Sequence, residues 1–370
     1  MIITSPTWLI KVFLFKTLNY ISIRREKLPL VEIDGSVGEG GGQIIRTSIA
    51  LSIATCTPIL IYNIRKKRPN PGLQPQHYTG IKVASIISNA KVEGLRIGSD
   101  LIRFEPKTIS PNISKVDIGT AGSIPLVLQT LIPALVTTKL SFPLEVIGGT
   151  DVKWSPTIDY IRKVFAPCLD VLGIELNVEV KRRGYYPKGG GVVVFQVKNK
   201  FFPREFKFEK SNKEVKILSV CSNLPKSVAE RQASTILNIL ERSRINMPKT
   251  IEILTESSLS PGTSVLVYTI GPKGVFIGAD SVGEKGKSAE RVGLEAATAF
   301  LNELSLMPDV DTHLSDMVVP YLFLSPFPSK IRISKVTSHL ETNLYVSSLF
   351  IKRSYKLKEE FDGSIVMDIL

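Results

Sequence analysis

Apolar residues recur along this chain with two spacings that alternate. Between Gln43 and Thr55 the side chains of Ile45, Ile49 and Ile53 stand four residues apart, which predicts an amphipathic helix. The β-branched run that follows, Pro58 to Ile64, predicts a strand. Helical and strand patterns continue to alternate in this way, which indicates an α/β protein.

A unit of helix, strand, helix and sheet recurs about three times, and each copy begins with a glycine-rich or polar segment. The predicted helices cover residues 43–55, 76–90, 123–135, 156–172, 314–324 and a last segment that begins near 337. The predicted strands and hairpins cover 58–64, 93–104, 140–147, 174–183, 191–198 and 330–335. A repeat of so long a period differs from a solenoid and predicts one domain built from three βα copies.

A different segment separates the second copy from the third. Its first part, Lys200 to Glu214, is dense in charge, as a linker would be. Strands are predicted at 215–220, 250–254 and 264–270, and helices at 227–242 and 289–304. We therefore expect an N-terminal extension at 1–28, a large domain at 29–209 and 306–370, and an inserted α/β domain at 210–305.

Composition narrows the class of protein. The 370 residues include 47 Lys and Arg and 34 Asp and Glu, so the net charge is +13. This excess of positive charge suggests a polyanionic partner. The three cysteines are far apart in the sequence, which excludes a disulfide framework and a cysteine zinc site and fits a reducing compartment. No apolar run reaches the length of a membrane span, and the N-terminus lacks a signal peptide. We expect a soluble, cytoplasmic protein.

The first candidate for chemistry is the glycine-rich segment from Asp34 to Arg46. Glycines before a helix let backbone amides face an anion, and Arg46, one turn into the helix, would point toward the same group. Glu39 would repel a phosphate unless a divalent cation lies between them, and Mg²⁺ is commonly held by one or two carboxylates together with substrate phosphates. The alternative is a tight turn in which Glu39 is solvated.

Two basic clusters could bind phosphate or nucleic acid. The loop from Arg65 to Pro75 holds four cations and three prolines, and its arginines suit phosphate oxygens, although a solvated charged loop is an equal alternative. The cluster from Lys181 to Lys188 places cations beside Tyr185 and Tyr186, a combination that suits single-stranded nucleic acid. An ordinary hairpin with one aromatic ring in the core explains the second cluster as well or better.

Only three histidines are present: His77, His313 and His339. His339 lies near the start of the last predicted helix, where the positive end of the helix dipole would keep the imidazole neutral and nucleophilic. A single histidine at a helix start is more often structural. No serine hydrolase motif and no zinc protease motif accompanies these histidines.

Taken together and in order, the motifs are more specific than any one of them. They are Asp34-Gly-Ser-Val-Gly-Glu-Gly-Gly-Gly-Gln-Ile-Ile-Arg46, Arg65 to His77, Gly119-Thr-Ala-Gly-Ser123 through Gln129, Gly148-Gly-Thr-Asp151 through Pro156, His313-Leu-Ser-Asp316 and Ser338-His-Leu-Glu-Thr-Asn343. This series closely resembles the RNA 3'-terminal phosphate cyclase family, from about residue 30 to the C-terminus. Residues 1–28 have no counterpart.

The resemblance implies a fold and a reaction. The family fold is a large domain of three βα repeats, with helix pairs on four-stranded sheets, and a smaller inserted α/β domain. Members of the family use ATP and a divalent metal, Mg²⁺ or Mn²⁺, to convert an RNA 3'-phosphate to a 2',3'-cyclic phosphate. The reaction is a ligase-type nucleotidyl transfer in RNA processing: a histidine accepts AMP and releases pyrophosphate, AMP passes to the RNA 3'-phosphate, and the 2'-hydroxyl closes the ring.

The resemblance also assigns residues by position. His339 would be the nucleophile, with Arg46 and Arg68 as essential catalytic residues, and Glu39 would lie near the metal. The residues implied for the RNA end and phosphates are Arg65 and Gln76. The residues implied for the nucleotide are Gln129, Pro156, His313 and Asp316. His313 stands where some members have a tyrosine, and Met317 replaces a glutamine found in some members, so contacts to adenine are the least secure part of the assignment.

The implied partners are ATP and RNA with a 3'-phosphate end, and no membrane. A homodimer is one alternative for the oligomeric state. Three other functions stay open at the level of sequence: a cyclase-like protein without catalysis that binds RNA in ribosome assembly, an enolpyruvyl transferase built from similar repeats, and a general RNA-binding protein. Retention of His339, Glu39, Arg46 and Arg68 argues against the first.

Overall fold

Three sheets of the molecule repeat one strand order. The computed structural model describes residues 29–108, 110, 113–138, 141–198, 214–270 and 276–370. The first sheet has the order β1 (Val31–Asp34), β2 (Ile59–Tyr62), β4 (Ile102–Glu105) and β3 (Lys91–Glu93). The second has the order β5 (Lys115–Asp117), β6 (Leu144–Gly148), β8 (Gly191–Lys198) and β7 (Glu175–Arg182). The third has the order β13 (Ser329–Ile333), β15 (Ile365–Ile369) and β14 (Tyr355–Glu359).

Pairing directions show that these sheets are copies of one unit. In the first two sheets the first pair of strands is parallel, and the remaining pairs are antiparallel. In the third sheet Val310 forms a single parallel bridge with Ile333, in the place that a first strand takes in the other two. The expected fold of three βα repeats on small sheets is confirmed, and the first strand of the third repeat has shrunk to this bridge.

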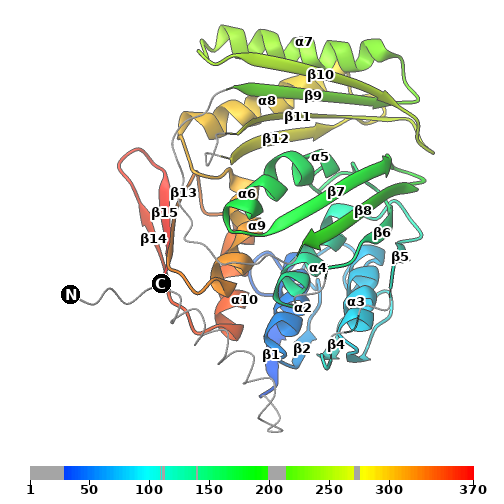
Figure 1. The fold of residues 1–370 in the computed structure, drawn as a ribbon, viewed down its shortest axis with the longest axis vertical. Coiled ribbons are helices and arrows are strands. Elements are labelled where there is room, and N and C mark those ends of the chain that lie inside the picture. Colours follow the sequence, from blue (N-terminus) through cyan, green and yellow to red (C-terminus); the bar gives the residue numbers. More distant parts are fainter. Residues whose placement is uncertain (1–28, 109, 111–112, 139–140, 199–213, 271–275) are drawn as a thin grey trace.

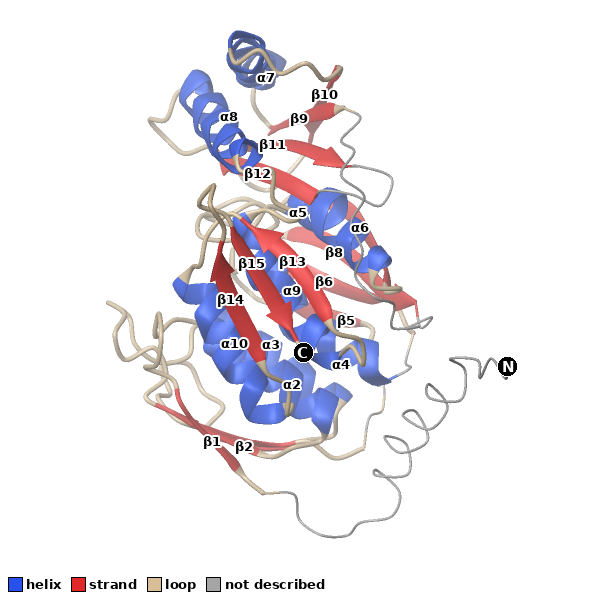
Figure 2. Cartoon of the chain, turned by 90° about the vertical axis from the view of Figure 1, so that its left-hand side faces the viewer, coloured by secondary structure: helices blue, strands red, loops and turns tan. Residues whose placement is uncertain are grey.

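Each repeat contributes helices to a common centre. The first repeat contributes α2 (Gln43–Thr55) and α3 (Pro75–Ile87). The second repeat contributes α4 (Ile124–Thr138) and a helical segment formed by α5 (Ile158–Tyr160), η1 (Ile161–Phe165) and α6 (Ala166–Val171). The third repeat contributes α9 (Thr312–Leu324) and α10 (Ser338–Phe350). Figure 1 shows these helices between the sheets, with α2 packed against α4 and α10. Figure 2 shows the third sheet with α10 and α2 behind it. Among the described helices, none is both long and apolar enough to cross a bilayer.

The segment between the second and third repeats forms a fourth sheet with its own helices. Its strand order is β10 (Lys249–Glu256), β9 (Val215–Ser222), β11 (Gly262–Ile270) and β12 (Phe276–Val282), and its helices are α7 (Lys226–Arg242) and α8 (Ala289–Ser305). This part lies at one end of the molecule (Figure 1). One face of its sheet shares a separate core with α7 and α8, and Leu218 and Leu266 on the other face join the core of the repeats. The expected domain boundaries stay predictions, and the extension at 1–28 lies outside the described residues.

Most predicted elements are present with bounds shifted by a few residues. The helix predicted at 156–172 is helical from 158 to 171, but a π-helical turn, η1, interrupts it. Five strands were not predicted: β1, β5, β12, β14 and β15. β5 alternates exposed, buried and exposed, but over only three residues, which is too short a pattern to mark a strand. Four of the five residues of β14 are exposed, so β14 lacks the alternation.

Candidate active site

The loop between β1 and α2 approaches other parts of the chain so closely that it requires glycine. Gly38 and Gly40 have φ angles of +61° and +60°, in the left-handed region that glycine adopts readily. A Cβ atom added to Gly42 would lie 2.2 Å from Nε2 of His77, which is too close for any side chain. A Cβ atom added to Gly41 would lie 2.9 Å from Nη2 of Arg68. The glycines thus let charged and polar side chains crowd over the N-terminus of α2.

Glu39, in the same loop, connects the first and third repeats. Its Oε2 lies 2.8 Å from Nδ1 of His339, and its Oε1 forms an ion pair with Arg68. Neither Oε2 of Glu39 nor Nδ1 of His339 is aligned for a hydrogen bond with any described residue, although both atoms are buried. The sequence predicted all three residues as site residues, and the structure places them in contact.

Arg46 points its guanidinium into this cluster from the first turn of α2. Its side chain is buried and donates to Oε1 of Gln43, while its Nε has no partner among the described residues. Burial and, to a smaller extent, the positive charge of Arg65 together lower the pKa of Arg46 to about 10. A buried cation with an unused donor and no carboxylate of its own is suited to bind an anion.

Arg65 and His77 line the other side of Arg46. Arg65 has a φ of +55°, and its Nη2 donates to the carbonyl of Asn70 at 3.2 Å, so the loop backbone holds it in place. His77 is buried, and its Nδ1 accepts from the backbone N–H of Gln74 at 3.2 Å. Burial, followed by the charges of Arg46 and Arg65, lowers the pKa of His77 to about 3. His77 is therefore neutral, with its proton on Nε2 toward Gly42.

The third repeat supplies His339 from the first turn of α10. The hydroxyl of Thr337 caps this helix by accepting from the N–H of Leu340 at 2.9 Å, and it donates to Oδ1 of Asp316 at 2.6 Å. Burial lowers the pKa of His339, the nearby carboxylate of Asp316 opposes that effect, and the charges of Arg46 and Arg68 add to it. The half-buried imidazole is consequently neutral near pH 7 and has a free lone pair.

Asp316 lies beneath this helix start. Its side chain is buried, and burial raises its pKa to about 6, although the hydrogen bond from Thr337 and the charge of His339 act in the opposite direction. The carboxyl group of Asp316 thus titrates closer to neutral pH than an ordinary aspartate does. Such a shifted group beside a histidine is typical of functional sites.

Sequence analysis did not identify the residue that joins the three helices of the site. Asn343 is fully buried; its Oδ1 accepts from Gln43 at 3.0 Å and from Thr47 at 2.6 Å, and its Nδ2 donates to the carbonyl of Asp316 at 2.6 Å. The residue ends the Ser338–Asn343 motif, but its partners lie about 300 positions away or on another helix, so sequence spacing could not reveal the role.

The remaining predicted residues lie farther along the surface. Gln76 lies in the first turn of α3 and packs against Gly122, in the loop before α4. Gln129 is half-buried in α4, and Pro156 precedes Thr157, whose N–H donates to Oδ2 of Asp280 at 2.7 Å. Among the described residues, no hydrogen bond or ion pair links the side chain of Gln129 to the His339 cluster.

His313 is exposed at the start of α9, near the buried carboxylate of Asp316 and the half-buried carboxylate of Asp280. The charge of His313 lowers the pKa of both Asp280 and Asp316, against the larger effect of burial. Its neighbour Asp311 caps the helix and accepts from Tyr160, so it is not free to bind a ligand. The structure therefore places His313 near Asp316, as the motif suggested, and brings in Asp280, which sequence analysis did not identify.

A metal site made by protein alone is not indicated: the described residues contain no cluster of three or more side chains suited to a metal ion. The orphaned Oε2 of Glu39 does fit a cation that takes one carboxylate and completes its shell with substrate oxygens.

The second basic cluster that the sequence singled out, Lys181 to Lys188, is largely structural. Arg183 and Tyr185 are buried, whereas Lys181, Arg182 and the turn from Tyr186 to Lys188 are exposed.

Comparisons with known proteins agree on one family. Residues 37–357 match the family model described as RNA 3'-terminal phosphate cyclase. The chain is 44% identical to the RNA 3'-terminal phosphate cyclase of Pyrobaculum aerophilum, over 89% of this chain and 95% of that protein. It is also 44% identical to the protein of the same name from Archaeoglobus fulgidus, over 91% of this chain and 99% of that protein.

Proposed function

The chain belongs to the RNA 3'-terminal phosphate cyclase family, and from this we propose that it is an ATP-dependent enzyme that converts the 3'-phosphate of an RNA end to a 2',3'-cyclic phosphate. One observation carries the proposal: the neutral imidazole of His339 lies 2.8 Å from Glu39 and next to two arginines. A nucleophile beside an array of cations suits attack on a polyanionic phosphate chain.

In the proposed first step, Nε2 of His339 attacks the α-phosphorus of ATP. The negative charge of Glu39, whose Oε2 lies 2.8 Å from Nδ1, would favour the proton on that nitrogen and leave the lone pair on Nε2. The N–P bond forms as the bond to the β-phosphate oxygen breaks, and pyrophosphate leaves with the electron pair. Arg46 and Arg68 would neutralise the charge on the phosphates.

Two further transfers complete the reaction. An oxygen of the RNA 3'-phosphate attacks the phosphorus of the histidine-bound AMP, the N–P bond breaks, and the end becomes a phosphoanhydride with AMP. The neighbouring 2'-hydroxyl then attacks the 3'-phosphorus, loses its proton and displaces AMP. Because a 2'-hydroxyl is required, RNA and not DNA would be cyclised. The net +13 charge of the chain favours binding of such an anionic end.

We assign the other predicted residues to the two substrates. Arg65 and Gln76 would bind phosphates of the RNA end; Gln129, Pro156, His313 and Asp316 would line the nucleotide. A divalent ion, Mg²⁺ or Mn²⁺, would be held by Oε2 of Glu39 and by ATP phosphates, and would supply further charge neutralisation. The orphaned Oε2 supports this assignment.

The decisive experiment uses ATP labelled at the α-phosphate with the full chain and Mg²⁺ or Mn²⁺. We expect label on the denatured protein that survives base, is lost in mild acid, and is discharged by 3'-phosphorylated RNA. The His339→Ala variant should acquire no label, whereas Ser348→Ala, an exposed position on the same helix, should behave as wild type. Absence of label with either metal would reject this proposal in favour of a non-catalytic RNA-binding protein.

A further inference from the structure

Two large aromatic side chains are exposed where the second repeat meets the inserted segment. Trp154, in the loop between β6 and α5, is 93% exposed, and Tyr186, in the turn between β7 and β8, is 79% exposed. Leu259, on the loop between β10 and β11, is half exposed and lies against Gly190 of the same turn. Such a group of exposed apolar side chains marks an interaction surface more often than isolated ones do.

The backbone presents Trp154 outward in a constrained conformation. Its φ is +61°, a region that bulky side chains rarely occupy unless the surrounding structure holds them there. The loop is fixed on both sides of the residue. Before it, the N–H of Thr150 donates to the carbonyl of Gly184 at 2.8 Å; after it, Ser155 bonds to Ser123 and Thr157 donates to Asp280.

Tyr186 is presented by an equally well-fixed turn. The preceding Tyr185 is buried, and its ring packs directly on the backbone of Gly262. A Cβ atom added to Gly262 would lie 2.1 Å from the Tyr185 ring. After Tyr186, the N–H of Lys188 donates to Ser260 at 3.1 Å, and Gly189 packs on the backbone of Ala121. Two anchored loops that expose their aromatic rings offer contact area with little loss of entropy on binding.

A continuous series of contacts leads from these loops to Arg46. Both loops touch the segment before α4, through Ser123 and Ala121 respectively. The same segment contacts Gln76 through Gly122, and the next residue, His77, lies against Gly42 beside Arg46. The exposed aromatic surface is thus next to the part of the site proposed to hold the RNA phosphate.

The charge of the surface is positive. Nζ of Lys153 lies 5.6 Å from the centre of the Trp154 ring, and Arg182 and Lys188 are exposed beside Tyr186. Two acidic side chains border the surface, and each is paired with a cation: Glu284 with Lys153, and Glu256 with the buried Arg183. Within the described part of the chain, no carboxylate pairs with Lys188. Aromatic rings interleaved with cations are typical of surfaces that bind single-stranded nucleic acid.

We propose that Trp154 and Tyr186 stack on the bases that precede the 3'-terminal nucleotide of a single-stranded RNA, with Lys153, Arg182 and Lys188 along its phosphates. The inference rests on the proposed function for the identity of the strand. It adds a binding surface that distinguishes a long RNA end from a short one, because a dinucleotide would end before reaching the rings.

The test compares binding and catalysis in full-length variants. The probe is a 3'-phosphorylated, single-stranded RNA of about ten nucleotides, within the usual site size of such proteins. Trp154→Ala and Tyr186→Ala should each weaken its binding and raise its KM about tenfold, the usual cost of losing one stacked base. Trp154→Phe should retain most of the affinity. Phe361→Ala, which removes a fully exposed ring from the turn between β14 and β15, is the matched control and should change nothing.

Three readouts separate this inference from the proposed function and from other occupants. Labelling of the protein by ATP, and the KM for ATP, should be unchanged in Trp154→Ala; a raised KM for ATP would instead place the ring at the nucleotide and overturn the inference. A 3'-phosphorylated dinucleotide should react equally with both proteins. Unchanged RNA binding in both alanine variants, or a change in sedimentation that marks a lost contact between two copies, would also overturn it. Absence of labelling in the wild type would reject the proposed function alone.

Discussion

His77 and His339 face the same group of arginines, but burial gives them different roles. His77 is 4% exposed, its Nδ1 accepts from the backbone, and its pKa falls to about 3, so it fixes the start of α3. His339 is half-buried, its pKa is lowered less, and its Nε2 forms no hydrogen bond with the part of the chain that the structure describes. Residue type alone would not separate a structural imidazole from a reactive one; the depth of burial does.

The shifted pKa of His77 predicts a loss of stability in acid. The unfolded chain binds a proton at this residue near pH 6.5, whereas the folded chain binds it only near pH 3. Stability should therefore be fully present above pH 6.5 and fall by about 1 kcal/mol per pH unit below it. His77→Gln keeps an acceptor for the N–H of Gln74 and removes the titration. Denaturant unfolding at pH 7.5, 6 and 5 should show the wild type losing stability relative to this variant.

The control for that measurement is His313→Gln, because this change removes an exposed histidine and leaves the buried His77 in place. Its unfolding curves should shift with pH as those of the wild type do. Parallel behaviour of His77→Gln and wild type across the same pH range would contradict the assignment of His77 as a buried neutral group.

At the scale of elements, the site depends on how three helix starts are held together. α2 carries Arg46, α9 carries Asp316, and α10 carries His339, and each of these residues lies in the first turns of its helix. Asn343 bonds to α2 and α9 from within α10. Because its side chain has no contact with solvent, it acts by fixing the distances between these helices.

Removing this side chain should therefore affect both stability and catalysis. Asn343→Ala removes the partner of the buried Thr47 hydroxyl and of the Asp316 carbonyl, at a cost of about 1–3 kcal/mol for each group left unsatisfied. The half-buried Gln43 loses one of the two hydrogen bonds that its Nε2 donates. We expect thermal unfolding at a clearly lower temperature and slower labelling of His339 by ATP. Ser348→Ala, near the end of the same helix, should change the unfolding temperature little. Equal stability of the two variants would rule out the bridging role.

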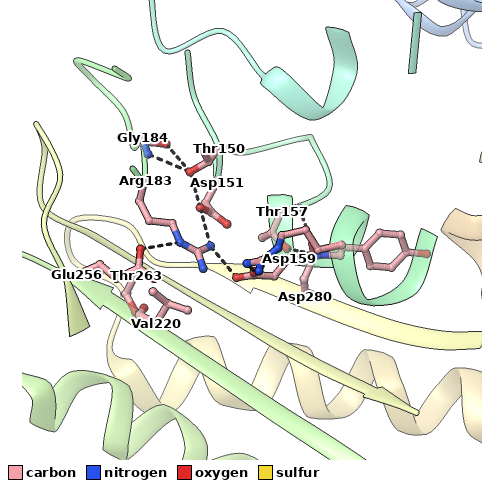
Figure 3. A network of polar contacts seen from close by, with 12 residues as sticks. Thr150, Asp151, Thr157, Asp159, Arg183, Gly184, Val220, Glu256, Thr263 and Asp280 are labelled. Atoms are coloured by element: carbon pink, nitrogen blue, oxygen red, sulfur yellow. Dashed lines mark hydrogen bonds and ion pairs between the residues drawn. The ribbon is translucent and has the colours of Figure 1, made fainter. Parts of the chain in front are cut away.

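For the molecule as a whole, one buried arginine joins the repeats to the inserted segment. Arg183 is fully buried between Asp151 at 3.4 Å, Asp159 at 2.6 Å and Glu256 at 3.1 Å, and Figure 3 shows its guanidinium pointing between the two aspartates. The aspartates belong to the second repeat, and Glu256 ends β10. The network fixes the loop of Trp154 and the turn of Tyr186 relative to each other.

Loss of Arg183 should destabilise the whole chain. Arg183→Met leaves the buried carboxylate of Asp151 uncompensated and leaves Asp159 with Arg162 as its one remaining cation among the described residues. Breaking a buried ion pair in this way typically costs about 3–5 kcal/mol. Burial already raises the pKa of Asp151, and removal of the cation would raise it further. Protonation then relieves the cost, so the loss of stability should be larger at pH 8 than at pH 5. The measurement is the free energy of unfolding of Arg183→Met at both pH values, with Arg182→Met, a change at the exposed neighbouring residue, as the control. An equal loss of stability in the two variants would contradict the role of Arg183.

The sequence by itself determined the repeating helices and strands and the main candidate residues. The four-residue spacing of Ile45, Ile49 and Ile53 requires a buried helix face wherever that helix packs, and α2 has the bounds that the pattern predicts. Short sequence motifs identified Glu39, Arg68 and His339 as candidate site residues. Such motifs can be recognised in the sequence because glycine and capping residues act on their immediate neighbours.

Only the tertiary structure decided which of these residues meet. Glu39 and His339 are 300 positions apart and touch because two repeats place the N-termini of α2 and α10 at one point. The roles of Asn343, Asp280 and Arg183 depend on partners in other elements, and the short strands β5 and β14 exist because a neighbouring strand is there to pair with. Long-range contacts of this kind depend on how the elements pack, and no local pattern of residues encodes them.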